Sequence, residues 1–161
     1  MEIAYLVDHP LLIPVLAGWF QDEWGYLSPG SSVLDVEDSL RHHLHRDELP
    51  LALVARSGSE AIGSASLRPF DMKTRKNLSP WLSSVYVPLA QRGQGIGSKL
   101  VQAAEAEAKR LGIFTLHLYT PDKESFYARL GWSRIETTEY RQETVSIMKK
   151  RLAAPELDET A

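Results

Sequence analysis

A short glycine-rich segment constrains the fold of this chain more than any other part of its sequence. The segment is Arg92-Gly93-Gln94-Gly95-Ile96-Gly97, and it stands between the apolar run Val85-Tyr86-Val87 and a stretch with helical periodicity. Glycines let a backbone turn tightly and approach a ligand closely. The first N–H groups of the following helix have no partner inside that helix, and the helix dipole makes this end positive. The segment therefore predicts a strand–turn–helix unit that binds an anionic group such as phosphate.

Two common phosphate-binding motifs do not fit this segment. A dinucleotide fingerprint requires the spacing G-x-G-x-x-G, but the residue three positions after Gly95 is Ser98. A P-loop requires a glycine directly before the lysine, and the residue directly before Lys99 is Ser98. A turn that only caps a helix is the remaining alternative, and a cap rarely needs three glycines in five residues.

The composition excludes several classes of protein. A chain of 161 residues is long enough for one domain with its own core, and its 43% hydrophobic and 24% charged residues are typical of a soluble globular protein. The absence of cysteine excludes disulfides and thiolate metal sites. A net charge of −3 gives no basic surface for nucleic acid. The sequence has no signal-peptide pattern and no run of 18 apolar residues, so we expect a cytoplasmic protein that does not span a membrane.

Hydrophobic periodicity predicts alternating strands and helices. The predicted strands are residues 2–7, 51–55, 61–68, 80–87, 114–119 and 143–152, and the predicted helices are 11–24, 35–46, 100–111 and 123–130. Asp122 is expected to cap the last helix, and Glu105 and Lys109 have the spacing of an exposed ion pair. We expect one domain over residues 1–152 and a disordered acidic tail over residues 153–161.

Three histidines lie close together at residues 42, 43 and 45. Imidazole is a common metal ligand, but the spacing fits no known zinc pattern, and His42 and His43 point in different directions on a helix. We therefore expect a solvated polar helix face and predict no metal site.

Two motifs together resemble a known family. The stretch from Val87 through Arg92 to Gly97, followed by a helix, a strand and Phe126-Tyr127-Ala128-Arg129-Leu130-Gly131-Trp132, resembles the acetyl-CoA-binding core of the GNAT N-acetyltransferases. The family pattern Arg/Gln-x-x-Gly-x-Gly/Ala is matched by Arg92, Gly95 and Gly97. The match covers residues 81–132, about a third of the chain. It implies an α/β fold whose mixed, mostly antiparallel central sheet has about seven strands, with helices on both faces.

The resemblance implies that acetyl-CoA is the cofactor and lies where the central strand diverges from the next. The backbone of Val85 and Val87 would bind the cofactor like an added strand. Many members have an asparagine contact near the position of Asp122. The implied cofactor-binding residues are Val85, Tyr86, Val87, Arg92, Gly93, Gln94, Gly95, Ile96, Gly97, Ser98, Asp122 and Tyr127.

The resemblance also suggests catalytic residues. Tyr127 stands at the family's usual position for the proton donor to the departing thiolate. Many members have a glutamate base on the central strand, where this chain has Ser83 and Ser84. Two other bases stay open. His117 faces away from the leucines of its strand and has a suitable pKa, and Glu23 is the second candidate, acting through water.

The acceptor site has weaker signals. Acidic and aromatic residues around the end of the first helix suit a cationic amine, and we assign Trp24, Tyr26, Trp81 and Ser83 to substrate binding. The basic residues Lys73, Arg75 and Lys76 lie in a loop for which three roles stay open. They contact the 3′-phosphate of coenzyme A, contact the acceptor, or are merely solvated.

These observations predict an N-acetyltransferase that moves the acetyl group of acetyl-CoA directly to a primary amine in a ternary complex. The acceptor is a small amine or the N-terminus of a peptide or protein. The alternative is a non-catalytic sensor module that binds acyl-CoA and does not need Tyr127. The oligomeric state is open, with a homodimer as one option.

Overall fold

The computed structural model of the chain describes residues 1–153, so all but the first residue of the expected acidic tail lies outside the described part. The strands are β1 (Glu2–Tyr5), β2 (Leu51–Ser57), β3 (Glu60–Arg68), β4 (Trp81–Tyr86), β5 (Thr115–Thr120), β6 (Ser133–Tyr140) and β7 (Glu143–Arg151). The α-helices are α1 (Ile13–Trp24), α2 (Val33–Arg41), α3 (Ile96–Arg110) and α4 (Glu124–Arg129).

The strands form one seven-stranded sheet in the order β1-β2-β3-β4-β5-β7-β6. All neighbouring strands are antiparallel except β4 and β5, which are parallel. The predicted mixed, mostly antiparallel sheet is therefore confirmed. Strand β6 was not predicted as a separate element, because it lies at the sheet edge with mostly exposed residues and contains no apolar run.

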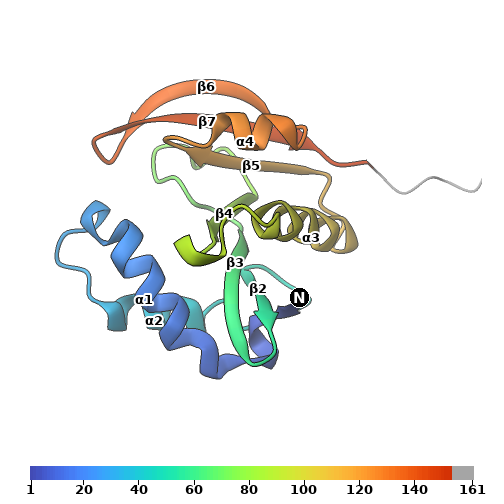
Figure 1. Cartoon of the computed structure of the whole chain (residues 1–161). Helices are drawn as coiled ribbons and strands as arrows, with labels where there is room; N and C mark the ends of the chain where they lie inside the picture. The colour runs from blue at the N-terminus through green and yellow to red at the C-terminus, as the bar shows by residue number, and fades with distance from the viewer. Residues whose placement is uncertain (154–161) are drawn as a thin grey trace, which may run out of the picture.

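Helices cover both faces of the sheet (Figure 1). Strand β2 is buried on both sides: Leu51 and Leu53 belong to the core that contains α3, while Ala52 and Val54 belong to the core that contains α1 and α2. A strand buried on both faces has a continuous apolar sequence, as this one does. The prediction of helices on both faces is confirmed.

Helix α3 packs on the sheet through its predicted apolar stripe. Leu100, Ala104 and Ala108 are completely buried. Glu105 is also buried, and one of its oxygens lies 2.5 Å from Lys150 Nζ on β7. The predicted exposed pair between Glu105 and Lys109 is therefore wrong, because this flank of the helix faces the sheet.

Helix α2 begins and ends earlier than its periodicity indicated. Ser32 and Asp35 form a capping box that starts the helix, which ends at Arg41. After the end of α2 the His43 side chain is buried, with 6% of its surface exposed. Its Nδ1 lies 2.8 Å from the Ser39 carbonyl oxygen. The prediction of a solvated histidine face is therefore wrong at His43, and burial lowers the pKa of this imidazole to about 4.

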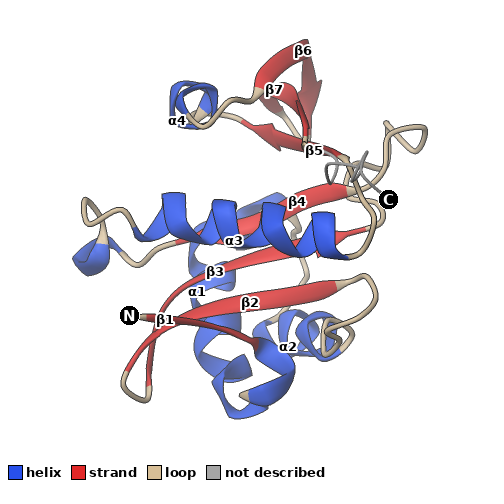
Figure 2. Ribbon diagram, turned by 90° about the vertical axis from the view of Figure 1, so that its right-hand side faces the viewer, coloured by secondary structure: helices blue, strands red, loops and turns tan. Residues whose placement is uncertain are grey.

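Strands β4 and β5 diverge soon after they meet (Figure 2). Their pairing contains one Cα pair, Trp81 and His117. Further along β4 the register with β3 shifts between Ser64 and Ser66, and Ser84 has a left-handed backbone with a φ of 53°. A β-bulge of this kind bends the strand that carries it. The bulge lies at the point where the sheet opens.

The buried His43 generates a prediction about stability. Unfolded histidine binds a proton below about pH 6.5, whereas native His43 stays neutral down to about pH 4. The stability that this difference contributes is fully present above pH 6.5 and is lost as the pH falls toward 4. The loss is at most about 3 kcal/mol, since one pKa unit corresponds to about 1.4 kcal/mol.

Urea unfolding of wild type and His43→Gln at about pH 7 and about pH 4.5 measures this contribution. The variant should lose less free energy of unfolding on acidification than the wild type. His42→Gln is the matched control, because His42 is exposed and should leave the wild-type pH dependence unchanged. Equal pH dependence in His43→Gln and wild type would contradict the assignment.

Candidate active site

A cavity of about 1570 Å³ opens where β4 and β5 diverge. It runs along the glycine turn, the end of β4, the start of α4 and the loop between β3 and β4. Gln94 is exposed and does not line it. The other residues that the sequence assigned to the cofactor all line the cavity: Val85, Tyr86, Val87, Arg92, Gly93, Gly95, Ile96, Gly97, Ser98, Asp122 and Tyr127.

The glycine turn has the geometry of an anion site. Gly93 and Gly95 have φ values of 81° and 78°, and a methyl group added at either would meet no protein atom within 4 Å. No side chain caps the first N–H groups of α3, so these donors face the cavity without an internal partner. Arg92 Nε donates to the Val87 carbonyl oxygen over 2.8 Å and ties the two ends of the turn together. The open cradle and the free donors fit the phosphates of coenzyme A.

The end of β4 presents its backbone to the cavity. Val85 and Val87 pack toward the core under α3, whereas Tyr86 packs on the opposite face of the sheet. There the Tyr86 ring lies 5.4 Å from that of Trp19 and 5.9 Å from that of Trp24. Because β5 pairs with β4 only at Trp81, this stretch is free to bind an extended ligand as an added strand.

Tyr127 lies on α4 at the inner wall of the cavity. Its side chain is 8% exposed and packs edge-on against Phe126 and Trp132. Burial, followed by the charge of Asp122, raises the pKa of the Tyr127 phenol above its ordinary value. The hydroxyl therefore keeps its proton at neutral pH.

The helix that carries Tyr127 is positioned by an unexpected cap. Thr120 Oγ1 accepts a hydrogen bond from the backbone N–H of Lys123 over 2.9 Å, and the side chain at the N-cap makes no bond. The prediction that Asp122 caps this helix is therefore wrong. Asp122 is exposed and lines the cavity beside Tyr127 instead.

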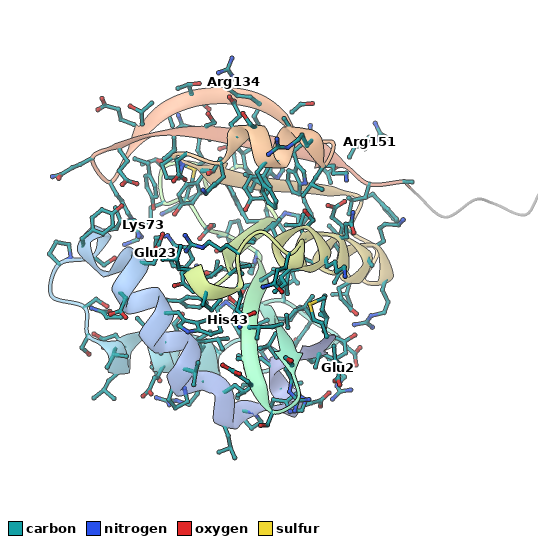
Figure 3. The ribbon with its side chains drawn as sticks, in the orientation of Figure 1. Glu2, Glu23, His43, Lys73, Arg134 and Arg151 are labelled. Atoms are coloured by element: carbon teal, nitrogen blue, oxygen red, sulfur yellow. The ribbon has the colours of Figure 1, made fainter. Side chains whose placement is uncertain are left out.

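The predicted acceptor residues Trp24, Tyr26 and Ser83 line the same cavity, and so does Glu23. The Tyr26 hydroxyl donates to Glu143 Oε1 over 2.5 Å, which links the short 3₁₀ turn after α1 to the start of β7. Glu23 and Lys73 project from different elements toward this region (Figure 3). The mouth of the cavity therefore carries charges of both signs.

Trp81 and His117 do not line the cavity. Trp81 is completely buried and donates from Nε1 to the Leu78 carbonyl oxygen over 2.8 Å. His117 is 6% exposed, its ring lies 5.7 Å from that of Trp81, and burial lowers its pKa. These two residues form the contact that joins β4 to β5. We therefore remove His117 from the candidate bases and Trp81 from the acceptor site.

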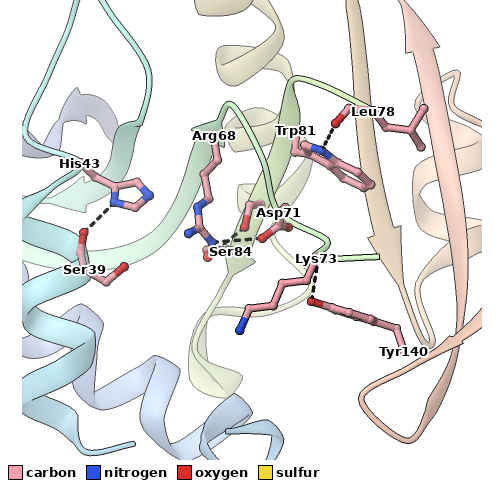
Figure 4. Close-up of polar contacts among 10 residues, drawn as sticks. Ser39, His43, Arg68, Asp71, Lys73, Leu78, Trp81, Ser84 and Tyr140 are labelled. Atoms are coloured by element: carbon pink, nitrogen blue, oxygen red, sulfur yellow. Dashed lines mark hydrogen bonds and ion pairs between the residues drawn. The ribbon is translucent and has the colours of Figure 1, made fainter. Parts of the chain in front are cut away.

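Several cavity residues were missed at the level of sequence. Asp71 has a side chain that is only 10% exposed, and its Oδ1 accepts from Arg68 Nη1 over 3.0 Å (Figure 4). The spacing of Arg68 and Asp71 permits such a pair, but no local pattern reveals that their loop is buried. Tyr119 and Arg141 line the same region.

The basic loop before β4 divides its side chains between two environments. Lys73 and Lys76 line the cavity, whereas Arg75 Nε donates to Glu136 Oε2 over 3.0 Å. Arg75 is therefore paired and not simply solvated, whereas Lys73 and Lys76 are exposed at the cavity and their role stays open.

Within residues 1–153 no three histidine, cysteine, aspartate or glutamate side chains are grouped in a way that could hold a metal ion. None of the helices in the same range has the length and apolar character needed to cross a membrane.

The sheet thus opens beside the uncapped N-terminus of α3. The sequence model of the Acetyltransferase (GNAT) family matches residues 14–132, and the chain belongs to this family. N-alpha-acetyltransferase 80 of Mus musculus is 31% identical over 129 residues, which are 76% of this chain and 38% of that protein. The chain spans about two fifths of the length of the curated relatives it matches.

Solved structures share the fold. An aminoglycoside 6′-N-acetyltransferase in complex with coenzyme A has a TM-score of 0.74 at 19% identity, covering 98% of this chain and 100% of its own. A ribosomal-protein-alanine N-acetyltransferase from Brucella melitensis has a TM-score of 0.72 at 21% identity, covering 94% of this chain and 100% of its own. The cofactor of the family is acetyl-CoA, and the glycine turn described above fits it.

We expect Gly95→Ala to weaken the binding of coenzyme A by about tenfold or more, because the added methyl group enters the space that the phosphate occupies. Gly58→Ala is the matched control. Gly58 also has a positive φ and open space around it, but it lies in the β2–β3 turn. Each variant should lose about 1 kcal/mol of stability through backbone strain.

Calorimetric titration with coenzyme A and thermal unfolding separate the two effects. The prediction requires weaker binding in Gly95→Ala alone, with similar destabilisation in both variants. Equal affinity for coenzyme A in both variants would remove the glycine turn from the cofactor site.

Proposed function

We propose that this protein transfers an acetyl group from acetyl-CoA to a primary amine by direct attack in a ternary complex. The observation that carries the proposal is the buried Tyr127 in the same cavity as the uncapped N-terminus of α3. A hydroxyl placed there serves a reaction that releases a thiolate, and a site that only binds the cofactor has no use for it.

The cofactor supplies an activated acetyl group as a thioester. The chain's own residues perform the remaining tasks. The N–H groups at the start of α3 hold phosphate, and the free edge of β4 orients the extended part of the cofactor. A backbone N–H of β4 stabilises the negative charge that develops during transfer. Tyr127 donates its proton to the sulfur that leaves.

The acceptor is an amine, either a small molecule or the N-terminus of a peptide or protein. Three proteins similar to this chain support an amine by name: one is an N-alpha-acetyltransferase, one an aminoglycoside 6′-N-acetyltransferase and one a ribosomal-protein-alanine N-acetyltransferase. Within the cavity, the exposed carboxylate of Glu23 and the Trp24 ring favour a cationic group at the mouth.

We expect Tyr127→Phe to lower kcat by ~10²-fold while the affinity for acetyl-CoA stays the same, because the change removes only the proton donor. Thiol release from acetyl-CoA, followed with a panel of short peptides and alkyl diamines, measures kcat. Calorimetry measures the affinity. Tyr5→Phe is the matched control, since its hydroxyl bonds to Glu107 and Tyr5 does not line the cavity.

The same assay separates transfer from sensing. A wild-type protein that binds acetyl-CoA but releases no thiol with any amine would favour the sensor module. A Tyr127→Phe variant as active as the wild type would remove Tyr127 as the donor and leave the transfer reaction standing.

A further inference from the structure

The proposed reaction needs a base, and of the two candidates from the sequence only Glu23 lines the cavity, where its side chain is exposed at the mouth. An amine in water near neutral pH is mostly a protonated ammonium ion, and it must lose a proton before it attacks. Strand β4 offers the hydroxyls of Ser83 and Ser84 where many family members have a glutamate, and His117 does not line the cavity. A proton acceptor must therefore come from another element.

Within residues 1–153 four carboxylates line the cavity, and one of them is almost fully enclosed. Glu23 and Asp122 are exposed, and Glu143 is bonded to the Tyr26 hydroxyl at the mouth. Asp71 alone is enclosed, with a side chain that is 10% exposed. It comes from the loop that connects β3 to β4.

Hydroxyl groups lie between Asp71 and the bulge. The Ser83 hydroxyl and the Asp71 carboxylate both line the cavity, and the hydroxyl acts on the carboxylate in the direction that lowers its pKa. The Ser83 Oγ lies 3.3 Å from the Ser84 Oγ, at the residue where β4 bends away. Ser64 Oγ donates to the Ser84 carbonyl oxygen over 3.2 Å, which fixes the bulge. Polar groups thus lie between the carboxylate and the point where the sheet opens.

We propose that Asp71 is the general base of the acetyl transfer, and that it takes the proton of the acceptor ammonium through the hydroxyls of Ser83 and Ser84. The proposal rests on the proposed function, since it assigns a role within that reaction. Arg68 then acts as a positioning residue, because its Nη1 donates to Asp71 Oδ1 and holds the carboxylate in the cavity wall.

The protons balance over one turnover. The ammonium gives its first proton to Asp71, and the neutral nitrogen then forms a bond to the acetyl carbon as the carbon–sulfur bond breaks. The nitrogen loses a second proton on becoming an amide, and the sulfur gains one from Tyr127. One of the two nitrogen protons restores Tyr127 and the other leaves to solvent from Asp71, so that a thiol, an amide and one proton are released.

The surroundings of Asp71 suit a base. Burial raises its pKa, and this effect outweighs the opposing charge of Arg68, the Ser83 hydroxyl and the charge of Arg141. Tyr119 on β5 lines the same cavity, and burial, followed by the charge of Asp71, raises the pKa of its phenol. A carboxylate with a raised pKa takes up a proton more readily near neutral pH.

The kinetic test compares Asp71→Asn, Asp71→Glu and the control Asp47→Asn. Asp47 is an exposed carboxylate bonded to Arg110 and does not line the cavity. With the peptide and alkyl diamine panel, Asp71→Asn should lower kcat/KM by ~10²-fold or more near neutral pH. The defect should shrink as the pH rises above the pKa of the amine, because the acceptor then arrives neutral. Asp71→Glu should recover part of the activity, and Asp47→Asn should match the wild type.

A structural role predicts a different pattern. A loss in Asp71→Asn that is equal at every pH, with a lower melting temperature and no recovery in Asp71→Glu, would overturn the proposal and leave Asp71 as a partner for Arg68 alone. Full activity in Asp71→Asn would overturn it as well. If the wild type acetylates no amine of the panel, the proposed function itself fails and this inference with it.

A measurement without turnover completes the test. Carbon NMR of the ligand-free protein follows the Asp71 carboxyl as the pH changes, with the signal assigned by its loss in Asp71→Asn. Its pKa should lie above 3.8 and rise further in Ser83→Ala, since the Ser83 hydroxyl stabilises the charged form. A pKa at or below 3.8, or no change in Ser83→Ala, would contradict the described network.

Discussion

The contact between Trp81 and His117 holds the two parts of the sheet together. It is the one Cα pair that β4 and β5 share, and both of its side chains are buried. The Trp81 indole bonds to the Leu78 carbonyl oxygen, and the His117 backbone N–H bonds to the Pro80 carbonyl oxygen. Because the junction is this short, the Ser84 bulge can separate the strands directly beyond it. The cavity is therefore a consequence of where pairing stops.

The same core supports both ends of the candidate site. Leu82 and Leu118, one from each diverging strand, belong to the core that also contains Leu100 of α3 and Tyr127 of α4. The helix that presents the glycine turn and the helix that carries the tyrosine thus rest on a common surface. Protein interiors are close-packed, so the distance between the glycine turn and Tyr127 is set by the side chains of this core. A substitution deep in this core would act on both ends of the site.

The sequence predicted the parts of the fold that depend only on residues close together in the chain. The glycine turn, the stripe on α3 and the strands around Gly58 follow from backbone freedom and periodicity, and these were found from sequence. The misses have a different origin. Whether His43 or Glu105 is buried depends on which element covers it, and strand β6 exists because β7 pairs with it. Asp71 belongs to the same group, since a carboxylate in a polar loop carries no signal of burial until the loop folds over β4.

The position of Asp71 explains why a carboxylate inside the site can be tolerated before an acceptor arrives. Burying an isolated charge is unfavourable, and a paired charge is far less so. Arg68 pairs with Asp71 within the cavity wall, whereas Glu23 and Glu143 lie near the mouth. In the proposed reaction the carboxylates at the mouth and the carboxylate paired with Arg68 then have different roles. The acids at the mouth attract the ammonium ion, and the paired carboxylate inside removes its proton once water has been displaced.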